Sequence, residues 1–171
     1  MIREVFNGKQ FKIIQEDVVD ELGVSHIVEK CIRPDVVTVL LKRDDSVLLL
    51  REFRPEYKKN VFWLPGGKID SGEEPVLCAQ RELEEETGYV VPTSMFSLFH
   101  KKSPSDVSRD GFVFLADISN SDIKDVGDKG PEKGDLVWFP LDNASSLLSQ
   151  SEPFFMSNEL FIFLILKLAS S

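Results

Sequence analysis

Residues 67–89, with the sequence GKIDSGEEPVLCAQRELEEETGY, constrain the fold most, because they specify a helix and place several charges on one of its faces. At about 100° per residue, Glu82, Glu85 and Glu86 fall within roughly a third of the helix circumference, while Glu84 points away. Three carboxylates on one face repel each other, so a divalent cation is their natural compensator. Oxygen ligands of this kind suit hard cations such as Mg²⁺ or Mn²⁺.

The residues around these acids predict where the helix begins and ends. Ser71 and Glu74 have capping-box spacing, Pro75 is tolerated in a first turn, and Gly88 can end the helix in the left-handed conformation. The apolar residues of the segment fall on the adjoining face and are Val76, Ala79 and Leu83. We therefore expect the acids at the rim of the core, where a pocket can form.

A solvated, charged helix is the plain alternative, since runs of charge usually cover surfaces. The distribution of charge argues against it. Residues 67–89 contain seven acids and two bases, whereas the other 148 residues contain 22 acids and 18 bases. More than half of the net charge of −9 is thus concentrated in 23 residues, which indicates a site.

The residue types and spacing of this stretch resemble the Nudix hydrolase signature at every fixed position of that signature. The matching residues are Gly67, Glu73, Arg81, Glu82, Leu83, Glu85, Glu86 and Gly88, followed by Tyr89, where the family more often has an aliphatic residue. The resemblance implies an α+β fold, namely an α/β/α sandwich with a mixed β-sheet. It also implies hydrolysis of a nucleoside diphosphate linked to another group.

The same resemblance implies roles for individual residues. The metal ligands would be Glu82, Glu85, Glu86 and the backbone carbonyl of Gly66, with Mg²⁺ as the ion and Mn²⁺ as a possible substitute. Glu73 and Arg81 would form an internal pair that holds the loop against the helix.

The chain around the signature resembles the ADP-ribose pyrophosphatase and nucleotide-sugar branch of the family, roughly over residues 8–148. The resembling segments are residues 50–55, residues 64–70 and the pair Ser103-Pro104. In that branch the substrate is a small nucleotide, and the amino-terminal strands often exchange between the subunits of a homodimer. Residues 1–32 would then do the same.

Two departures from the branch leave the catalytic base open. Trp63 stands where the branch commonly has a glutamate, and Arg109 stands where it has an acidic residue in the loop after the signature. The candidates for the general base are Asp106, Asp110 and Glu85. The metal-binding Glu82 and Glu86 complete the predicted catalytic set.

The predicted substrate contacts combine a backbone turn with two arginines. Gly67 lets the backbone approach a ligand closely, because glycine has no Cβ. Arg51 and Arg54 follow a buried strand and could bind a phosphate, although surface arginines in a turn are an equal alternative. Trp63 or Phe53 could stack on a base or ribose, with ordinary core packing as the more common role of such residues.

Composition limits the remaining possibilities. From a length of 171 residues and a hydrophobic content of 42%, we expect one domain, residues 1–171. The acidic balance of the chain speaks against nucleic-acid or anionic-membrane partners. The apolar run at residues 160–166 is too short to span a bilayer, and from the first residues we expect no secretory signal. Two cysteines predict buried thiols in a reducing compartment, so we expect a cytoplasmic protein.

The hydrophobic pattern predicts strands with a last helix. The expected strands are 11–16 and 24–32 as a hairpin, 35–41 and 46–51 as a buried pair, 90–100 interrupted by Pro92, 111–118 and 135–140. Residues 101–110 read as a loop and 120–134 as a mobile charged segment. Residues 141–149 and 157–168 read as helices, the second being a core helix over the sheet or a subunit interface.

Two other functions stay open from the sequence. One is cleavage of nucleoside triphosphates or capped RNA ends, against which the acidic balance weighs modestly. The other is a ligand-sensing module that has kept the fold and lost turnover, which the missing loop acid alone supports.

Overall fold

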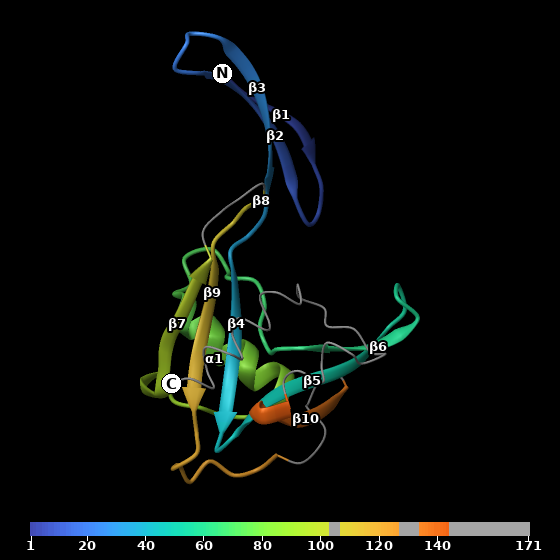
Figure 1. Cartoon of the computed structure of the whole chain (residues 1–171), viewed down its shortest axis with the longest axis vertical. Helices are drawn as coiled ribbons and strands as arrows, with labels where there is room; N and C mark the ends of the chain where they lie inside the picture. The colour runs from blue at the N-terminus through green and yellow to red at the C-terminus, as the bar shows by residue number, and fades with distance from the viewer. Residues whose placement is uncertain (103–106, 127–133, 144–171) are drawn as a thin grey trace.

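The computed structural model describes residues 1–102, 107–126 and 134–143, and its strands form two sheets (Figure 1). The smaller sheet has the order β1-β2-β3-β8, and its strands are β1 (Ile2–Asn7), β2 (Lys12–Val19), β3 (Ser25–Ile32) and β8 (Val107–Ser108). The larger sheet has the order β10-β5-β4-β9-β7, and its strands are β10 (Asp135–Pro140), β5 (Ser46–Arg54), β4 (Val36–Arg43), β9 (Gly111–Asp117) and β7 (Phe96–Lys102). A further strand, β6 (Lys59–Trp63), pairs with β5.

The larger sheet is mixed, as predicted. β4 runs parallel to β9 from Val36↔Gly111 to Lys42↔Asp117, whereas the other neighbours in this sheet are antiparallel. β4 and β5 form the expected buried pair only next to their turn, at Lys42↔Val47 and Arg43↔Ser46. Beyond that point β6 replaces β4 as the partner on this edge of β5, while β10 pairs along its other edge from Ser46 to Arg51. The two apolar strands β4 and β5 therefore diverge, and the core extends between them.

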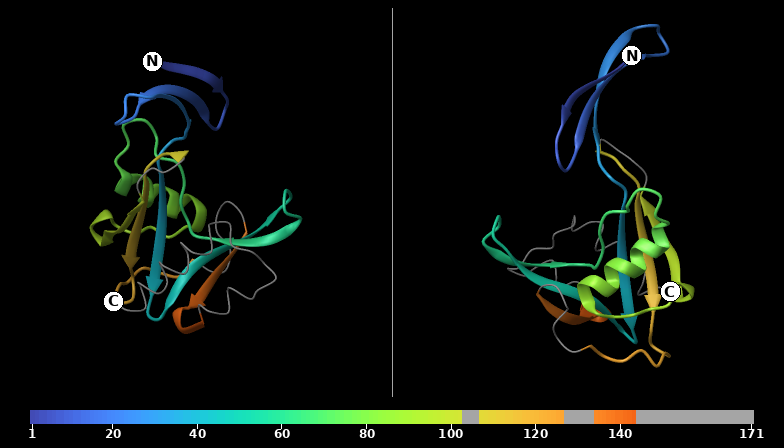
Figure 2. Two further views of the ribbon diagram at one scale, coloured as in Figure 1. Left: turned by 45° about the horizontal axis from the view of Figure 1, so that its top comes forward. Right: turned by 180° about the vertical axis from the view of Figure 1, so that it is seen from behind.

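Helix α1 (Pro75–Thr87) covers one face of the larger sheet and packs against β4 and β9 (Figure 2). Its buried residues are Cys78, Ala79, Leu83 and Thr87, so the predicted apolar side of the helix is the buried one. Val76 is partly buried against the same cluster. The mixed sheet with a helix on one face agrees with the α+β sandwich expected from the sequence. The second helical layer was expected at residues 157–168, which lie outside the described residues.

The start of α1 differs from the prediction, whereas its end agrees with it. The predicted capping box at Ser71 is wrong, because the helix begins one residue after Glu74 and no side chain caps it. Pro75 occupies the first turn, where its missing N–H costs nothing. Gly88 ends the helix in the left-handed conformation with φ 79°, and its N–H donates to the Glu84 carbonyl over 2.8 Å.

Several strand boundaries also differ from prediction. The hairpin at residues 11–16 and 24–32 is present, but β2 continues to Val19. The strand expected at 90–100 starts only at Phe96, because a 3₁₀ turn, η1 (Thr93–Met95), follows Pro92. The loop expected at 101–110 contains the end of β7 and all of β8. β1 and β6 were not expected as strands. Residues 144–149, most of the other predicted helix, lie outside the described residues.

The first three strands stand apart from the rest of the molecule as an arm (Figure 1). We call residues 1–32 the arm. β8 and residues 33–35 join it to the larger sheet. The arm leaves apolar side chains such as Ile27 exposed, with 60% of that residue accessible. Within the described ranges, no helix has the length and apolar character needed to cross a membrane.

Candidate functional site

The glycine turn between β6 and α1 is fastened to β4 by backbone hydrogen bonds. The Val39 N–H donates to the Pro65 carbonyl over 2.8 Å, and the Val37 N–H donates to the Gly67 carbonyl over 2.9 Å. Gly66 has φ 153°, and a Cβ there would collide with the Val37 carbonyl. Only glycine therefore lets this turn lie directly on β4.

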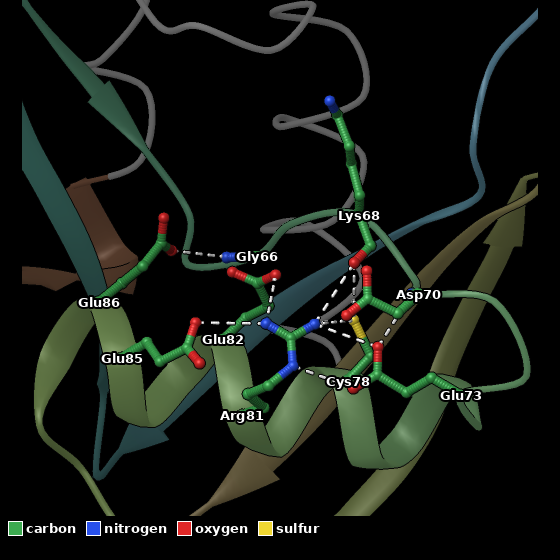
Figure 3. A network of polar contacts seen from close by, with 9 residues as sticks. All are labelled: Gly66, Lys68, Asp70, Glu73, Cys78, Arg81, Glu82, Glu85 and Glu86. Atoms are coloured by element: carbon green, nitrogen blue, oxygen red, sulfur yellow. Dashed lines mark hydrogen bonds and ion pairs between the residues drawn. The ribbon is translucent and has the colours of Figure 1, made fainter. Parts of the chain in front are cut away.

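The predicted carboxylates of α1 lie against this turn. A Cβ at Gly67 would collide with the carboxylate of Glu82, so the missing side chain makes room for that acid. The Gly66 N–H donates to Glu86 Oε2 over 2.9 Å (Figure 3). Glu82 is mostly buried, with 15% of its side chain exposed, whereas Glu85 is 49% exposed. Burial raises the pKa of Glu82, although Arg81 opposes this effect.

Arg81 is the centre of the polar network shown in Figure 3. Its Nε and Nη2 donate to the two carboxylate oxygens of Glu73 over 3.0 and 3.1 Å. Its Nη1 donates to Glu82 Oε1 over 2.9 Å and to Glu85 Oε2 over 3.2 Å. The hydrogen bonds from Arg81 hold the pKa of Glu73 down at about 2. The pair expected between Glu73 and Arg81 is therefore present and ties the loop to the helix.

The donor set fits a hard divalent cation in its chemistry. Three carboxylates and a turn of backbone without side chains supply only oxygen atoms. Among the described residues, however, no three acidic, histidine or cysteine side chains converge on a common point. Arg81 binds two of the three carboxylates and the Gly66 N–H binds the third. The arginine thus offsets part of the negative charge of this face in the protein alone.

A cavity of about 250 Å³ lies beside the glycine turn. Its walls are the start of β4, the end of β6 with Leu64, the two glycines and Arg109. Trp63 lines it and also packs against the core. The guanidinium of Arg54 lies 4.1 Å from the centre of the Trp63 ring. Phe53, the other aromatic residue considered for stacking, is 57% exposed and lines no part of this cavity.

Other predicted site residues lie outside the cavity wall. Arg51 is paired with Asp135 over 3.5 Å, and Arg54 with Glu52 over 3.2 Å. The carboxylate of Asp110 is paired with Lys101 over 2.7 Å. Asp106 lies outside the described residues. The structure therefore brings Gly66, Gly67 and the three glutamates together. Arg54 is linked to the cavity through its contact with Trp63.

Sequence reasoning treated Arg109 only as a departure and did not consider Arg33. Arg109 lines the cavity, and Arg33 is close enough to lower its pKa further, although burial is the larger cause. Cys78 was expected to be a buried thiol, and burial raises its pKa to about 12. Its thiol donates to the Lys68 carbonyl over 3.3 Å, so Cys78 holds the loop that precedes α1.

Comparison with known proteins places the chain in a family. The family model described as NUDIX domain matches residues 32–157. The ADP-ribose pyrophosphatase of Bacillus subtilis (strain 168) is 33% identical over 115 residues, which cover 67% of this chain and 62% of that protein. The methanol dehydrogenase activator of Bacillus methanolicus is 26% identical over 148 residues, which cover 86% of this chain and 80% of that protein.

A solved structure shares the fold. The crystal structure of an ADP compounds hydrolase matches with a TM-score of 0.75 at 22% identity. The match covers 99% of this chain and 90% of that one.

Proposed function

The chain belongs to the Nudix domain family, and from that premise we propose that it hydrolyses the pyrophosphate bond of a nucleoside diphosphate derivative. The proposed substrate is ADP-ribose or a nucleotide sugar, and the products for ADP-ribose are AMP and ribose 5-phosphate. One observation carries the proposal. The carboxylates of Glu82 and Glu86 lie against a turn without side chains, next to a cavity.

The proposed cofactor is Mg²⁺, with Mn²⁺ as a substitute, held by Glu82, Glu85, Glu86 and the Gly66 carbonyl. When bound, such a cation neutralises phosphate charge and makes water more acidic. The buried, partly desolvated position of Glu82 supports this assignment, because a cation there would offset the cost of keeping the carboxylate charged. Gly67 stays a proposed substrate contact because it lines the cavity, although the room left by its missing side chain is taken by the Glu82 carboxylate.

The proposed general base is Glu85 rather than Asp110. Glu85 is half exposed on the same helix face as Glu82 and Glu86, so water can reach it, and its bond to Arg81 is made through Oε2. Asp110 is paired with Lys101 and lines no part of the cavity. Asp106 stays a candidate on sequence grounds. Both proposed phosphate-binding arginines are paired with an acid, Arg51 with Asp135 and Arg54 with Glu52. Arg54 is the better placed of the two because it stacks on Trp63, which lines the cavity.

A substrate panel tests the proposed function. The protein is incubated with Mg²⁺ and, separately, ADP-ribose, GDP-mannose, UDP-glucose, NADH, GTP and a diadenosine polyphosphate, and release of nucleoside monophosphate is measured. We expect monophosphate from ADP-ribose or a nucleotide sugar. Activity restricted to triphosphates would replace the proposed substrate class, and tight binding without turnover would instead indicate a sensing module.

We also propose a homodimer in which the arm, residues 1–32, packs on a second copy. The exposed apolar residues of the arm favour this dimer. Single exposed apolar side chains are common, but a protruding sheet that buries little of its surface is only weakly stabilised by its own chain.

A further inference from the structure

Two arginines lie opposite each other where the arm joins the larger sheet. β3 and β8 run parallel, with Cys31↔Val107 and Ile32↔Ser108 as partners. The next positions in this register are Arg33 and Arg109, and the Arg33 N–H donates to the Ser108 carbonyl over 3.4 Å. Like charges at directly opposed positions destabilise a sheet unless something compensates them.

The neighbouring acids do not compensate this pair. The Asp110 carboxylate is paired with Lys101, and Asp35 Oδ1 accepts the backbone N–H of Asp110 over 2.7 Å. Within the described part of the chain, neither arginine forms a salt bridge, and the Nε of Arg33 is buried without a hydrogen-bond partner. Both arginines are only partly exposed, so water screens their repulsion incompletely.

Arg109 brings this uncompensated charge into the cavity of the proposed active site. Of the described residues that line the cavity, Arg109 alone is charged, and the rest are apolar, threonine or glycine. Arg81, the one arginine of the signature, already binds Glu73, Glu82 and Glu85. In the proposed function the carboxylate face and its cation would bind the diphosphate, so Arg109 is a separate positive group in the space next to it.

We propose that Arg109, reinforced by Arg33, binds a negatively charged group on the non-nucleoside part of the substrate. This inference rests on the proposed function and narrows it to nucleoside diphosphate derivatives whose second part carries a phosphate or a carboxylate. A neutral sugar in this cavity would remove water from Arg109 without replacing its hydrogen bonds. An anion supplies them as charge-assisted bonds, which are the stronger kind.

Two matched substrate pairs test the inference. UDP-glucose and UDP-glucuronate differ by one carboxylate, and ADP-ribose and ADP-ribose 1″-phosphate differ by one phosphate. Within a pair, we expect the wild-type kcat/KM to be about tenfold or more higher for the charged member, as one charge-assisted hydrogen bond allows. A preference in the first pair alone assigns a carboxylate, and one in the second pair alone assigns a phosphate.

Variants test whether Arg109 causes the preference for the charged member of each pair. R109Q is expected to abolish the preference, chiefly by lowering kcat/KM for the charged member, whereas R109K, which keeps the charge without the fork of donors, retains part of it. R3Q removes an equal charge from the arm, where Arg3 pairs with Asp17, and should leave the preference unchanged.

Equal wild-type kcat/KM within both pairs, or a preference that survives in R109Q, overturns the inference. An equal loss of kcat/KM for both members of a pair in R109Q also overturns the inference, because Arg109 would then bind the diphosphate that both members share. Hydrolysis of GDP-mannose but of none of the four compounds overturns this inference alone. If the wild type hydrolyses neither the four compounds nor GDP-mannose, the proposed function itself fails and this inference fails with it.

Discussion

At the scale of single residues, Arg81 sets the charge balance of the acidic face. It forms a two-bond pair with Glu73 and single bonds with Glu82 and Glu85, so one cation offsets much of the repulsion predicted from the sequence. Because Glu73 also accepts the Asp70 N–H over 3.0 Å, this pair fixes the loop that leads into α1. The loop therefore depends on the ionised form of Glu73.

The lowered pKa of Glu73 gives a prediction about stability and pH. A carboxyl whose pKa falls from 4.5 to about 2 on folding stabilises the protein above pH 4.5, and this contribution disappears as the pH falls through that interval. E73Q should therefore unfold at a lower urea concentration than the wild type at pH 7, and the difference should shrink toward pH 2. E84Q, on the opposite face, should show no such pH-dependent difference. A gap between E73Q and wild type that is the same at pH 7 and pH 3 would contradict the account.

At the scale of elements, the end of α1 depends on Gly88. Its φ of 79° is strained for any residue with a Cβ, and its N–H bonds to the Glu84 carbonyl. We expect G88A to lower the free energy of unfolding by about 1 kcal/mol, measured by chemical denaturation. G111A is the matched control, because a Cβ at Gly111 would make only ordinary contacts, at 3.6 Å from Lys102. Equal losses in the two variants would contradict the role of the left-handed cap.

Elements with strong local signals were predictable from the sequence, and elements defined by pairing were not. The apolar runs of β4, β9 and β10 and the periodicity of α1 are local, so each was expected at about its observed place. β1 has no buried residue and β8 has two residues, so neither gives a hydrophobic pattern. Their existence follows from partners elsewhere in the chain.

The site residues also divide into those predictable from local sequence and those that depend on strand pairing. The glycine turn and the three glutamates lie within one continuous stretch, and their closeness follows from a helix and a turn. The Ser71 cap failed because a turn with Gly72 at φ 81° separates Ser71 from the helix. The Arg33 and Arg109 pair could not be predicted, since it depends on the register between β3 and β8.

At the scale of the whole molecule, the arm gives a prediction about assembly. The chain has a mass of 19.4 kDa, and light scattering should give twice that value if residues 1–32 pack on a second copy. I27E places a charge on an exposed apolar position of β3 and should shift the protein toward the monomer. Q10E adds a charge at an exposed polar position in the same arm and should not. A monomeric wild type would contradict the proposed dimer.

The central claim is that the acidic face of α1 binds the cation on which hydrolysis depends, and kcat of E86Q against E84Q tests it most directly. Glu84 lies on the same helix and is exposed, so E84Q makes the same chemical change away from the glycine turn. With ADP-ribose or the best substrate of the panel and saturating Mg²⁺, E86Q should lose at least about a hundredfold in kcat, because electrostatic stabilisation by a bound cation contributes several kcal/mol. E84Q should retain wild-type kcat, and both variants should keep the circular dichroism spectrum of the wild type. A folded E86Q with near-normal kcat would contradict the claim.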